Sequence, residues 1–510
     1  MKKVIILDFG SQYTQLIARK TRELGVFSEI FPFFTGLSEI KKEDPGAVIL
    51  SGGPQSVYDC DAPKSSFDIR EIGVPLLGIC YGLQFMSDSL GGQVVSSQKR
   101  EYGFASLEIK KRDGLLEGVE NQSQVWMSHG DRVSKIPPGF AVTGVTENCD
   151  KAVIENTKDR LFGVQFHPEV IHTHQGQKIL SNFLFKISGM EPKWNMKFFI
   201  DKKVQEIREL TKDQKVICGL SGGVDSLVTA LLVKQAVDNN LICIFVNNGL
   251  LRKGQYKDLS HKFRKEFKLE VMAVDAAERF LKKLKGVIPP EKKRRVIGKE
   301  FIKIFEQEAD KIGGAKFLAQ GTIYPDVVES NPVTGPSSSI KSHHNVGGLP
   351  EKLSFKLVEP LKELFKDEVR ELGIKLGVKR NFIYQHPFPG PGLAVRIVGE
   401  VTKGRLKTIR DADAVVIDEV RNAGLYNDLW QAFAVLLPVK SVGVMGDKRT
   451  YQWVVVVRLV QSVDGMTAGW FQADPSLLSR ISTRIVNEVE GVNRVVYDIT
   501  SKPPGTIEWE

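Results

Sequence analysis

The sequence predicts an α/β protein with two parallel-sheet α/β domains followed by a smaller α+β domain. Short apolar runs alternate with helical patterns over residues 1–192 and again over 193–385, the order expected of parallel sheets covered by helices. Over residues 386–510 the chain turns to alternating strands, such as VVVVRLV and RVVYDIT, mixed with helices. A chain of 510 residues is too long for one ordinary domain, and this division gives three.

The composition is that of a globular protein with large hydrophobic cores. Apolar residues make up 42% of the chain and charged residues 26%, and no run of about 18 apolar residues occurs. The five cysteines show neither a CxxC pair nor metal-ligand spacing, which favours a reducing, cytoplasmic location. The net charge of +10 admits nucleic-acid binding, but the basic residues are spread out and no nucleic-acid-binding motif accompanies them. We therefore expect neither a nucleic-acid partner nor a membrane partner.

The first domain is built on apolar runs that end in small or polar residues. Such runs are typical of buried parallel strands whose carboxyl ends carry a functional site. The four runs are KVIILDFG (3–10), GAVILSGGP (46–54), VPLLGIC (74–80) and RLFGVQFHPE (160–169). The segment SGMEPKWNM (188–196) breaks this pattern and is the predicted linker to the second domain.

Cys80 is a candidate nucleophile. It lies between Gly78 and Gly82 where an apolar strand passes into a helical pattern, and the glycines permit a sharp turn that exposes a nucleophile. The dipole of the following helix favours a thiolate. His167 ends another apolar strand, and if that strand continues, Glu169 lies on the same side and orients the imidazole. A structural cysteine beside an unrelated surface histidine is the alternative.

The segments GICYGLQ and HPE resemble those of the class I glutamine amidotransferases, over roughly residues 3–190. The resemblance implies that a thiolate attacks the side-chain amide of glutamine and that glutamate and ammonia are released. Its nucleophile, proton carrier and orienting acid would be Cys80, His167 and Glu169. The oxyanion hole and glutamine site would be formed by Gly52 and Gly53 of the LSGGP turn, Tyr81, Gln84, and Ser128 and His129 of SHGD.

The stretch SGGVDS, residues 221–226, follows a buried strand and opens a helical pattern. Its small residues leave backbone N–H groups and serine hydroxyls for an anion at a helix start. The Lys of the GxxxxGK[ST] loop is absent, so an ordinary P-loop kinase or ATPase is not expected. A plain helix N-cap is the alternative.

SGGVDS resembles the PP-motif of the N-type ATP pyrophosphatases, which adenylate a carbonyl oxygen and expel pyrophosphate. The resemblance implies Mg²⁺ as the cofactor with ATP, held by Asp225 and Asp326. The backbone of Val246 would contact adenine. The remaining ATP-binding residues would be Gly219, Leu220, Ser221, Gly222, Gly223, Asp225 and Ser226.

The whole chain is similar in domain order to the glutamine-hydrolysing GMP synthetase family. The segments that carry this likeness are QGTIYPDVVES, HPFPGPGLAVR, GVMGDKRTY and YDITSKPPGTIEWE. The likeness implies that ATP adenylates the C2 oxygen of xanthosine 5′-monophosphate (XMP). Ammonia would then displace AMP to give GMP, AMP and pyrophosphate. It also implies a homodimer formed through the C-terminal domain.

The same likeness assigns XMP contacts to Arg294, Lys502 and Glu508. On chemistry alone, a basic cluster such as EKKRR at 291–295 is usually a solvated face. The sequence departs from the family at Asn247, where VDNGLLR commonly has Asp, so any role of that carboxylate in nucleotide binding is in doubt here.

The segment 331–350 is rich in Gly, Pro, Ser and His and has no core-building period. Such a long loop is either disordered or a functional lid, and we favour the lid. Two acidic residues before it are candidates for a role in the adenylation step, and three basic residues belong to the lid, which in the family closes over the substrates. These residues are Asp326, Glu329, Lys341, His343 and His344.

Two other functions are consistent with parts of this evidence. An amidotransferase-coupled adenylating enzyme with a different acceptor would share both motifs, and AMP release only with XMP would distinguish the two. A regulatory nucleotide- or RNA-binding protein with inactive sites is a third hypothesis. The complete set of Cys80, His167 and Glu169 and the complete SGGVDS loop argue against it.

Overall fold

A computed structural model describes residues 2–313, 315–330, 355–462, 465 and 467–510. These residues separate into two compact units, one ending at Phe199 and one beginning at Ile200. None of the helices in the described ranges has the length and apolar content needed to cross a membrane. The lid residues Lys341, His343 and His344 lie outside the described residues.

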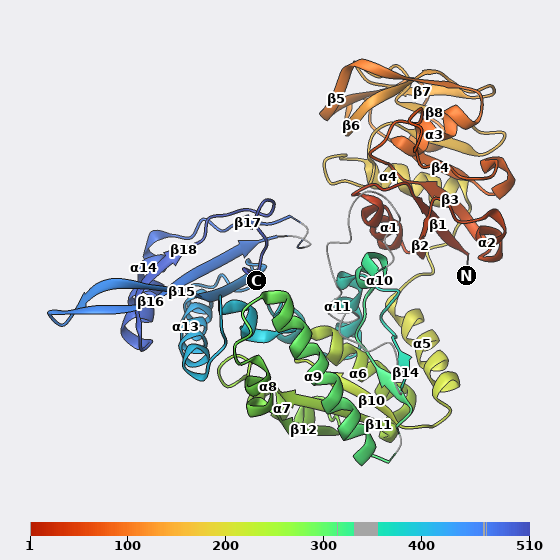
Figure 1. Cartoon of the computed structure of the whole chain (residues 1–510). Helices are drawn as coiled ribbons and strands as arrows, with labels where there is room; N and C mark the ends of the chain where they lie inside the picture. The colour runs from red at the N-terminus through yellow and green to blue at the C-terminus, as the bar shows by residue number, and fades with distance from the viewer. Residues whose placement is uncertain (1, 314, 331–354, 463–464, 466) are drawn as a thin grey trace. The chain divides into compact units, whose positions relative to one another are not determined.

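The first unit is built on a nine-stranded mixed sheet with the order β2-β1-β3-β4-β9-β8-β7-β5-β6 (Figure 1). Its first five strands are parallel, as predicted, and the other four extend it in antiparallel pairs. The strands are β1 (Lys3–Asp8), β2 (Ser28–Pro32), β3 (Pro45–Leu50), β4 (Leu76–Ile79), β5 (Gln93–Ile109), β6 (Ser123–Lys135), β7 (Ala141–Val145), β8 (Val153–Asn156) and β9 (Leu161–Val164).

The helices of this unit pack on the parallel part of the sheet, with α1 beside α4 and α3 against β3, β4 and β9. They are α1 (Thr14–Glu23), α2 (Leu37–Lys42), α3 (Tyr81–Ser89) and α4 (Gly176–Ser181), while α5 (Met196–Thr211) crosses the boundary between the units. The segment predicted as a linker is packed rather than free. The Trp194 ring lies 4.6 Å from the Phe27 ring and 5.7 Å from the Phe199 ring, measured between centroids.

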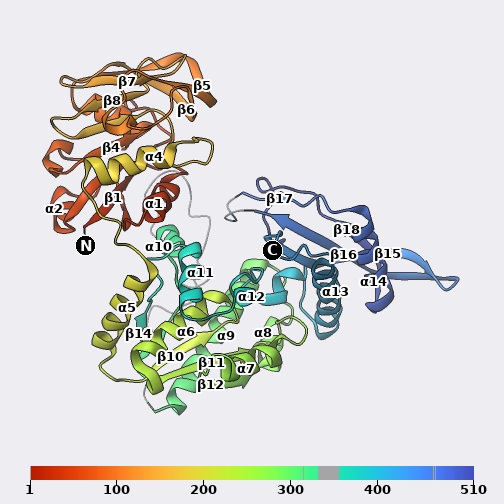
Figure 2. The ribbon, with the colours of Figure 1, turned by 180° about the vertical axis from the view of Figure 1, so that it is seen from behind.

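The second unit begins with a parallel five-stranded sheet of order β12-β11-β10-β13-β14, in which α6 packs on β10 and β11 (Figure 2). The chain leaves β10 for β11 on one side and returns to β13 on the other, so the carboxyl end of β10 is a topological switch point, the usual ligand position in such sheets. The strands are β10 (Val216–Leu220), β11 (Leu241–Asn247), β12 (Val271–Asp275), β13 (Phe317–Ala319) and β14 (Lys356–Val358). The helices are α6 (Val224–Val237), α7 (Gln255–Lys265), α8 (Ala277–Leu284), α9 (Pro290–Lys311), α10 (Tyr324–Ser330), α11 (Lys366–Lys375) and α12 (Arg380–Ile383).

The C-terminal part forms a four-stranded sheet with two long helices packed against it. These elements are β15 (Gln431–Met445), β16 (Lys448–Gln461), β17 (Gly469–Trp470), β18 (Val492–Tyr497), α13 (Lys403–Asn422) and α14 (Pro475–Glu488). One hydrophobic core joins this sheet to the parallel sheet, because it contains Ile217 and Ile244 as well as Val455 and Val457. The predicted second and third domains therefore share a core.

The passage from β4 into α3 is tight enough to require glycine. A Cβ atom on Gly78 would lie 2.6 Å from the carbonyl oxygen of Gly82, and one on Gly82 would collide with the carbonyl oxygen of Leu50. Both obstacles are backbone atoms, which cannot move aside without displacing α3 or β3. The two glycines therefore fix how closely α3 approaches the sheet.

We expect Gly82→Ala to destabilise the first unit by roughly 3 kcal/mol, because the added methyl group must displace backbone. Chemical unfolding followed by fluorescence would measure this change. Gly36→Ala is the matched control, since a Cβ atom added there would have no heavy atom within 4 Å, and we expect a change below about 0.5 kcal/mol. Equal stability of the two variants would show that the close approach is not required.

Candidate active sites

Cys80 occupies the sharp turn between β4 and α3 that the sequence predicts. Its backbone has φ +51° and ψ −107°, a conformation with positive φ that residues other than glycine rarely adopt. Such strain is found mainly at functional positions, where the surrounding structure maintains it. The turn places the Cys80 thiol 3.6 Å from the main-chain oxygen of Ser128, which comes from β6.

His167 and Glu169 are brought together, but not by a continuing strand. The condition that the strand continues through both residues is not met, because β9 ends at Val164 and the chain turns at Pro168 and Glu169. Glu169 instead reaches back from a turn, and His167 Nδ1 donates to Glu169 Oε1 at 2.7 Å. The His167 main chain is anchored by its N–H, which donates to the Trp126 oxygen at 3.0 Å.

The surroundings of His167 favour its protonated form. Burial lowers the pKa of His167, but the charge of Glu169 and the hydrogen bond with Cys80 outweigh burial, so the pKa lies well above its usual value. The imidazole thus has Glu169 as one partner and the Cys80 thiol as another. An imidazolium in this position can return a proton to a leaving amine.

The LSGGP turn lies against His167 and Tyr81. A Cβ atom on Gly52 would lie 3.2 Å from His167 Cε1, and one on Gly53 would lie 3.1 Å from the ring of Tyr81. The Tyr81 hydroxyl is fixed by donating to the Pro63 oxygen at 2.7 Å. The backbone of Gly53 and Tyr81 therefore lies beside the nucleophile, where N–H groups can stabilise an oxyanion.

Gln84, Ser128 and His129, which are assigned to glutamine binding, lie near the turn that carries Cys80 or are connected to it by hydrogen bonds. Gln84 Nε2 donates to the main-chain oxygen of Asp131 at 2.9 Å. The Ser128 main chain faces the Cys80 thiol. The His129 ring lies buried between the main-chain oxygen of Asp131 and the carboxylate of Glu101.

Gln165 is a further residue at the nucleophile that the sequence analysis did not single out. It is fully buried, and its Nε2 lies 3.7 Å from Cys80 Sγ while its Oε1 accepts from Gln84 Nε2 at 3.3 Å. The available signal was a polar residue inside an apolar run, two positions before His167.

The SGGVDS loop joins the end of β10 to the start of α6 at the switch point of the second sheet. Its two serine hydroxyls lie 3.0 Å apart, and Ser226 Oγ accepts from the Ser221 N–H at 3.1 Å. Gly222 has φ +89°, and Gly223 is the N-cap of α6. Gly219 approaches the Phe305 ring so closely that a Cβ atom would lie 2.9 Å away. The hydroxyls thus shape the loop at the helix start.

Lys366 supplies the positive charge that the loop itself lacks. Its Nζ lies 2.6 Å from both carboxylate oxygens of Asp225, although it belongs to α11, 141 residues further along the chain. The loop after β13 also reaches Asp225, since a Cβ on Gly321 would lie 3.2 Å from the Asp225 Cβ. Asp326 Oδ2 accepts from the Ile323 N–H at 3.0 Å at the start of α10, the helix that also contains Glu329.

Asn247 ends β11, directly after the buried Val246. Its Oδ1 accepts from the Gly249 N–H, and its Nδ2 donates to Asp275 Oδ1, both at 3.1 Å. An aspartate at this position could accept the first bond but would place a second negative charge against Asp275. The amide of Asn247 therefore avoids this repulsion and donates a hydrogen bond to the Asp275 carboxylate.

Each of the three residues assigned to XMP has its own hydrogen-bond partners. Arg294 donates to the main-chain oxygen of Glu510 at 2.6 Å, and Lys502 Nζ donates to the Gly465 oxygen at 2.7 Å. Glu508 accepts from Arg396 Nη2 at 2.9 Å and from Gln431 Nε2 at 2.7 Å. Arg396 and Gln431 were not predicted, since nothing in their local sequence indicates a contact with the chain end.

Comparison with known proteins gives matches along the whole chain. The family model of class-I glutamine amidotransferases matches residues 5–187, that of NAD synthase matches 194–295, and that of the GMP synthase C terminal domain matches 418–509. Curated GMP synthases (glutamine-hydrolysing) from Brachyspira hyodysenteriae, Carboxydothermus hydrogenoformans and Aquifex aeolicus are each 55% identical, with 100% of this chain and 99% of each relative covered.

Glu169→Gln should slow alkylation of Cys80 by iodoacetamide at pH 7 by roughly tenfold, because less of the reactive thiolate is then stabilised. The Glu169 charge raises the pKa of His167, so its removal lowers that pKa and weakens the imidazolium that stabilises a thiolate. Mass spectrometry of the Cys80 peptide would measure the rate. Glu155→Gln is the control, because this equally buried carboxylate contacts Leu115 and Thr143 instead. An unchanged rate in Glu169→Gln would contradict the assigned role.

Proposed function

The chain belongs to the glutamine-hydrolysing GMP synthases, and from this premise we propose that it converts XMP to GMP with ammonia taken from glutamine. The observation that carries the proposal is the Cys80–His167–Glu169 arrangement beyond the carboxyl ends of the neighbouring strands β4 and β9, combined with a PP-loop in the same chain. We place the reaction in the cytoplasm, where the five unpaired cysteines remain reduced.

Ammonia is produced in the first unit. Cys80 Sγ attacks the side-chain carbonyl carbon of glutamine, and the backbone N–H groups of Gly53 and Tyr81 stabilise the oxyanion. His167 gives its proton to the departing nitrogen, which leaves as ammonia. The carbonyl carbon remains bound to Cys80 as a thioester. Water then gives a proton to the neutral His167 as it attacks the thioester carbon, and glutamate leaves as the Cys80 thiolate and the imidazolium are restored. Glu169 keeps the imidazole in the required orientation throughout.

Ammonia is used in the second unit. The C2 oxygen of XMP attacks the α-phosphorus of ATP, and pyrophosphate leaves on the SGGVDS loop at the N-terminus of α6. This step turns a poor leaving group into AMP, which ammonia displaces from C2 to give GMP. Lys366 contributes a positive charge beside the loop, and pyrophosphate is the anion that this charge would stabilise.

Mg²⁺ is the proposed cofactor with ATP. It is usually held by one or two carboxylates together with substrate phosphates, and Asp225 and Asp326 stand in the first turns of α6 and α10. The side chain of Asp225 remains 31% exposed beside Lys366. Both residues therefore offer oxygen ligands of the required kind, and the bound ion would neutralise phosphate charge.

The acceptor site is proposed to lie around the end of the chain. Glu508 would accept hydrogen bonds from the purine edge, and its carboxylate is already oriented by Arg396 and Gln431. Lys502 and Arg294 would provide positive charge for the XMP phosphate. These roles are carried over from the family, and the contacts support them by placing Arg294 at Glu510, two residues after Glu508.

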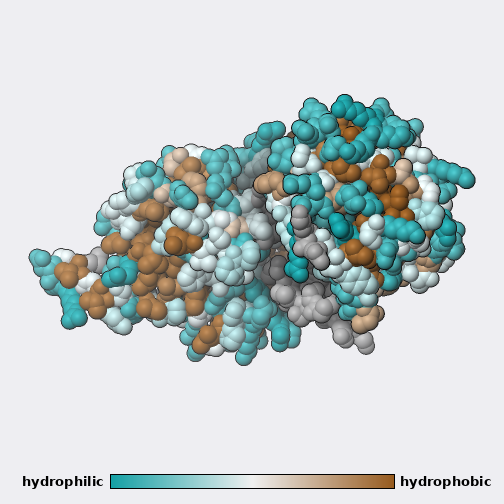
Figure 3. Space-filling model, turned by 90° about the horizontal axis from the view of Figure 1, so that it is seen from above, coloured by the Kyte–Doolittle hydropathy of each residue, from teal (hydrophilic) through white to brown (hydrophobic). Residues whose placement is uncertain are grey.

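The C-terminal sheet is the proposed surface of a homodimer. The hairpin of β15 and β16 exposes large apolar side chains, among them Val444 (74% exposed) and Tyr451 (66% exposed). Apolar residues are visible over the C-terminal part of the chain at the left of Figure 3. Exposed apolar side chains on a long hairpin favour association, because pairing removes them from water.

Product analysis with glutamine, ATP–Mg²⁺ and XMP tests the proposed function. We expect GMP, AMP, pyrophosphate and glutamate, with no AMP formed from other oxo-purine nucleotides. Cys80→Ala should lose glutamine-dependent GMP formation by at least about 10³-fold, the usual loss on removal of a nucleophile, and should retain GMP formation from added ammonia. AMP release with a different acceptor, or glutamine hydrolysis by Cys80→Ala, would overturn the assignment.

Val444→Asp combined with Tyr451→Asp should convert the dimer to a monomer, because two charges on the exposed hairpin would be buried on association. Analytical ultracentrifugation would report the change as a halving of the mass. Phe34→Asp is the matched control, since Phe34 is 53% exposed in the first unit and its replacement should leave the mass unchanged. A monomeric wild-type protein would refute the homodimer.

A further inference from the structure

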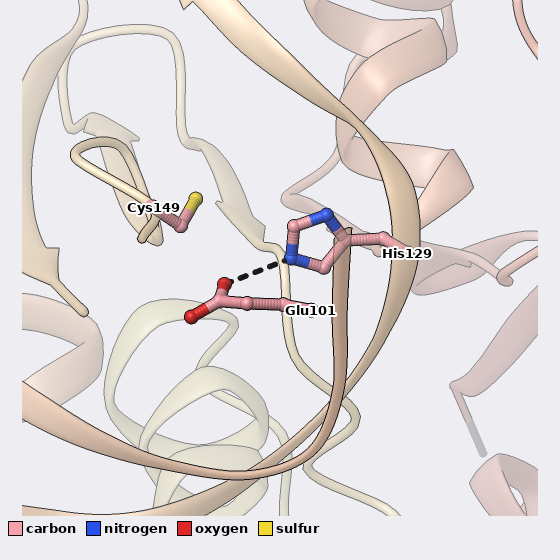
Figure 4. Close-up of side chains that lie close together, drawn as sticks. All are labelled: Glu101, His129 and Cys149. Carbon is pink, nitrogen blue, oxygen red and sulfur yellow. Dashed lines mark hydrogen bonds and ion pairs between the residues drawn. The ribbon is translucent and has the colours of Figure 1, made fainter. Parts of the chain in front are cut away.

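A second polar cluster lies inside the first unit, and two of its three members, Glu101 and Cys149, have no role in the chemistry described above. Glu101 on β5 and His129 on β6 are opposite each other in the strand register, and Cys149 approaches them from the turn after β7 (Figure 4). All three side chains are buried, and their polar atoms lie within 4.8 Å of one another. Buried polar groups of this kind are costly unless each is satisfied.

Hydrogen bonds hold the His129 ring at both of its nitrogens. His129 Nδ1 lies 2.9 Å from the main-chain oxygen of Asp131, and a carbonyl oxygen can only accept, so Nδ1 donates. His129 Nε2 lies 3.1 Å from a carboxylate oxygen of Glu101. The ring is therefore fixed between a main-chain carbonyl group and the Glu101 side chain. Burial raises the pKa of Glu101, but the bonds from His129 and Thr146 outweigh burial and lower it.

A metal ion would require these same atoms in another state. Both oxygens of Glu101 and both nitrogens of His129 already have partners, since Thr146 Oγ1 donates to Glu101 at 3.1 Å. A metal also needs a thiolate, and burial raises the pKa of Cys149 to about 12. The geometry thus favours a proton, and not a metal ion, between Glu101 and His129.

The pair is connected to the nucleophile through a chain of contacts. The Asp131 oxygen that accepts from His129 also accepts from Gln84 Nε2 at 2.9 Å. Gln84 in turn donates to Gln165, whose amide lies 3.7 Å from Cys80 Sγ. At the other end of the same strand segment, the Ser128 oxygen faces the Cys80 thiol.

We propose that Glu101 is a positioning residue of the glutamine site, acting through His129. The hydrogen bond from Glu101 holds the His129 ring, the ring holds the Asp131 carbonyl, and that carbonyl fixes both the amide of Gln84 and the backbone that follows Ser128. This inference rests on the glutamine hydrolysis proposed above. Because Glu101 touches neither Cys80 nor His167 in the described contacts, its loss should weaken glutamine binding more than it slows the chemistry.

Two variants of the full-length protein separate the possibilities. Glu101→Gln can keep every contact, because its carbonyl oxygen accepts from Thr146 while its amide donates to the unprotonated Nε2 of a neutral His129. Glu101→Ala loses both contacts. We expect Glu101→Ala to raise the KM for glutamine about tenfold or more, the scale of one lost hydrogen bond at a binding site. Its kcat should stay within about threefold of the wild type.

Glu101→Gln should restore a KM close to that of the wild type, and ammonia-dependent GMP formation should be retained in both variants. The matched control is Glu155→Ala, which removes a buried carboxylate of the same sheet bonded to Leu115 and Thr143 but not to Gln84. We expect this control to lower thermal stability without a selective rise in the KM for glutamine.

Three outcomes would overturn the inference. The first is a Glu101→Ala variant that, like Glu155→Ala, loses stability without a change in KM. The second is a Glu101→Gln variant as impaired as Glu101→Ala. The third is a stoichiometric metal ion in the purified wild-type protein, found by elemental analysis and lost in Glu101→Ala. Failure of the wild-type protein to hydrolyse glutamine would instead refute the proposed function.

Discussion

A charge that leaves water must meet an opposite charge or a full set of hydrogen-bond partners, and the functional parts of this chain depend on that constraint. It is clearest at the end of the chain, where three buried cations hold residues 498–510. Arg458 donates to the main-chain oxygens of Thr500, Thr506 and Ile507, and pairs with Asp498 at 2.8 Å. Lys293 meets Glu510 and the Ala394 and Ile397 oxygens, and Arg396 meets Glu508.

The same constraint operates at the two reaction centres. In the first unit, burial alone would keep His167 neutral, and the Glu169 carboxylate reverses that preference. In the second unit, Lys366 balances Asp225 beside the anion-binding loop. Each centre therefore combines a motif at a strand end with a partner of opposite charge, Glu169 for His167 and Lys366 for Asp225. The residues of each motif are close together in the sequence, whereas Lys366 is far from Asp225 in the sequence.

This difference explains how much could be predicted from the sequence. Cys80, the LSGGP turn and SGGVDS were recognisable, because each follows an apolar run and needs small residues at a sharp turn. The role of Lys366 could not be predicted, because its partner Asp225 lies 141 residues away in the sequence. A lysine in the first turn of a helix does not by itself indicate a functional site. The strand through His167 was predicted too long, since the alternation of apolar and polar residues continues past Val164, the last residue of the strand that is paired.

The proposed acceptor site was the least predictable part, because buried residues of the core determine its geometry. Asp413 is buried on α13 and pairs with Arg396 Nη1 at 3.3 Å. The Nε and Nη2 edge of the guanidinium is therefore left to bind Glu508. Two hydrogen bonds from one guanidinium fix the position of a carboxylate. The orientation of Glu508 toward any ligand is therefore decided by α13, a helix far earlier in the chain, and a substitution at Asp413 would act on the chain end without touching it.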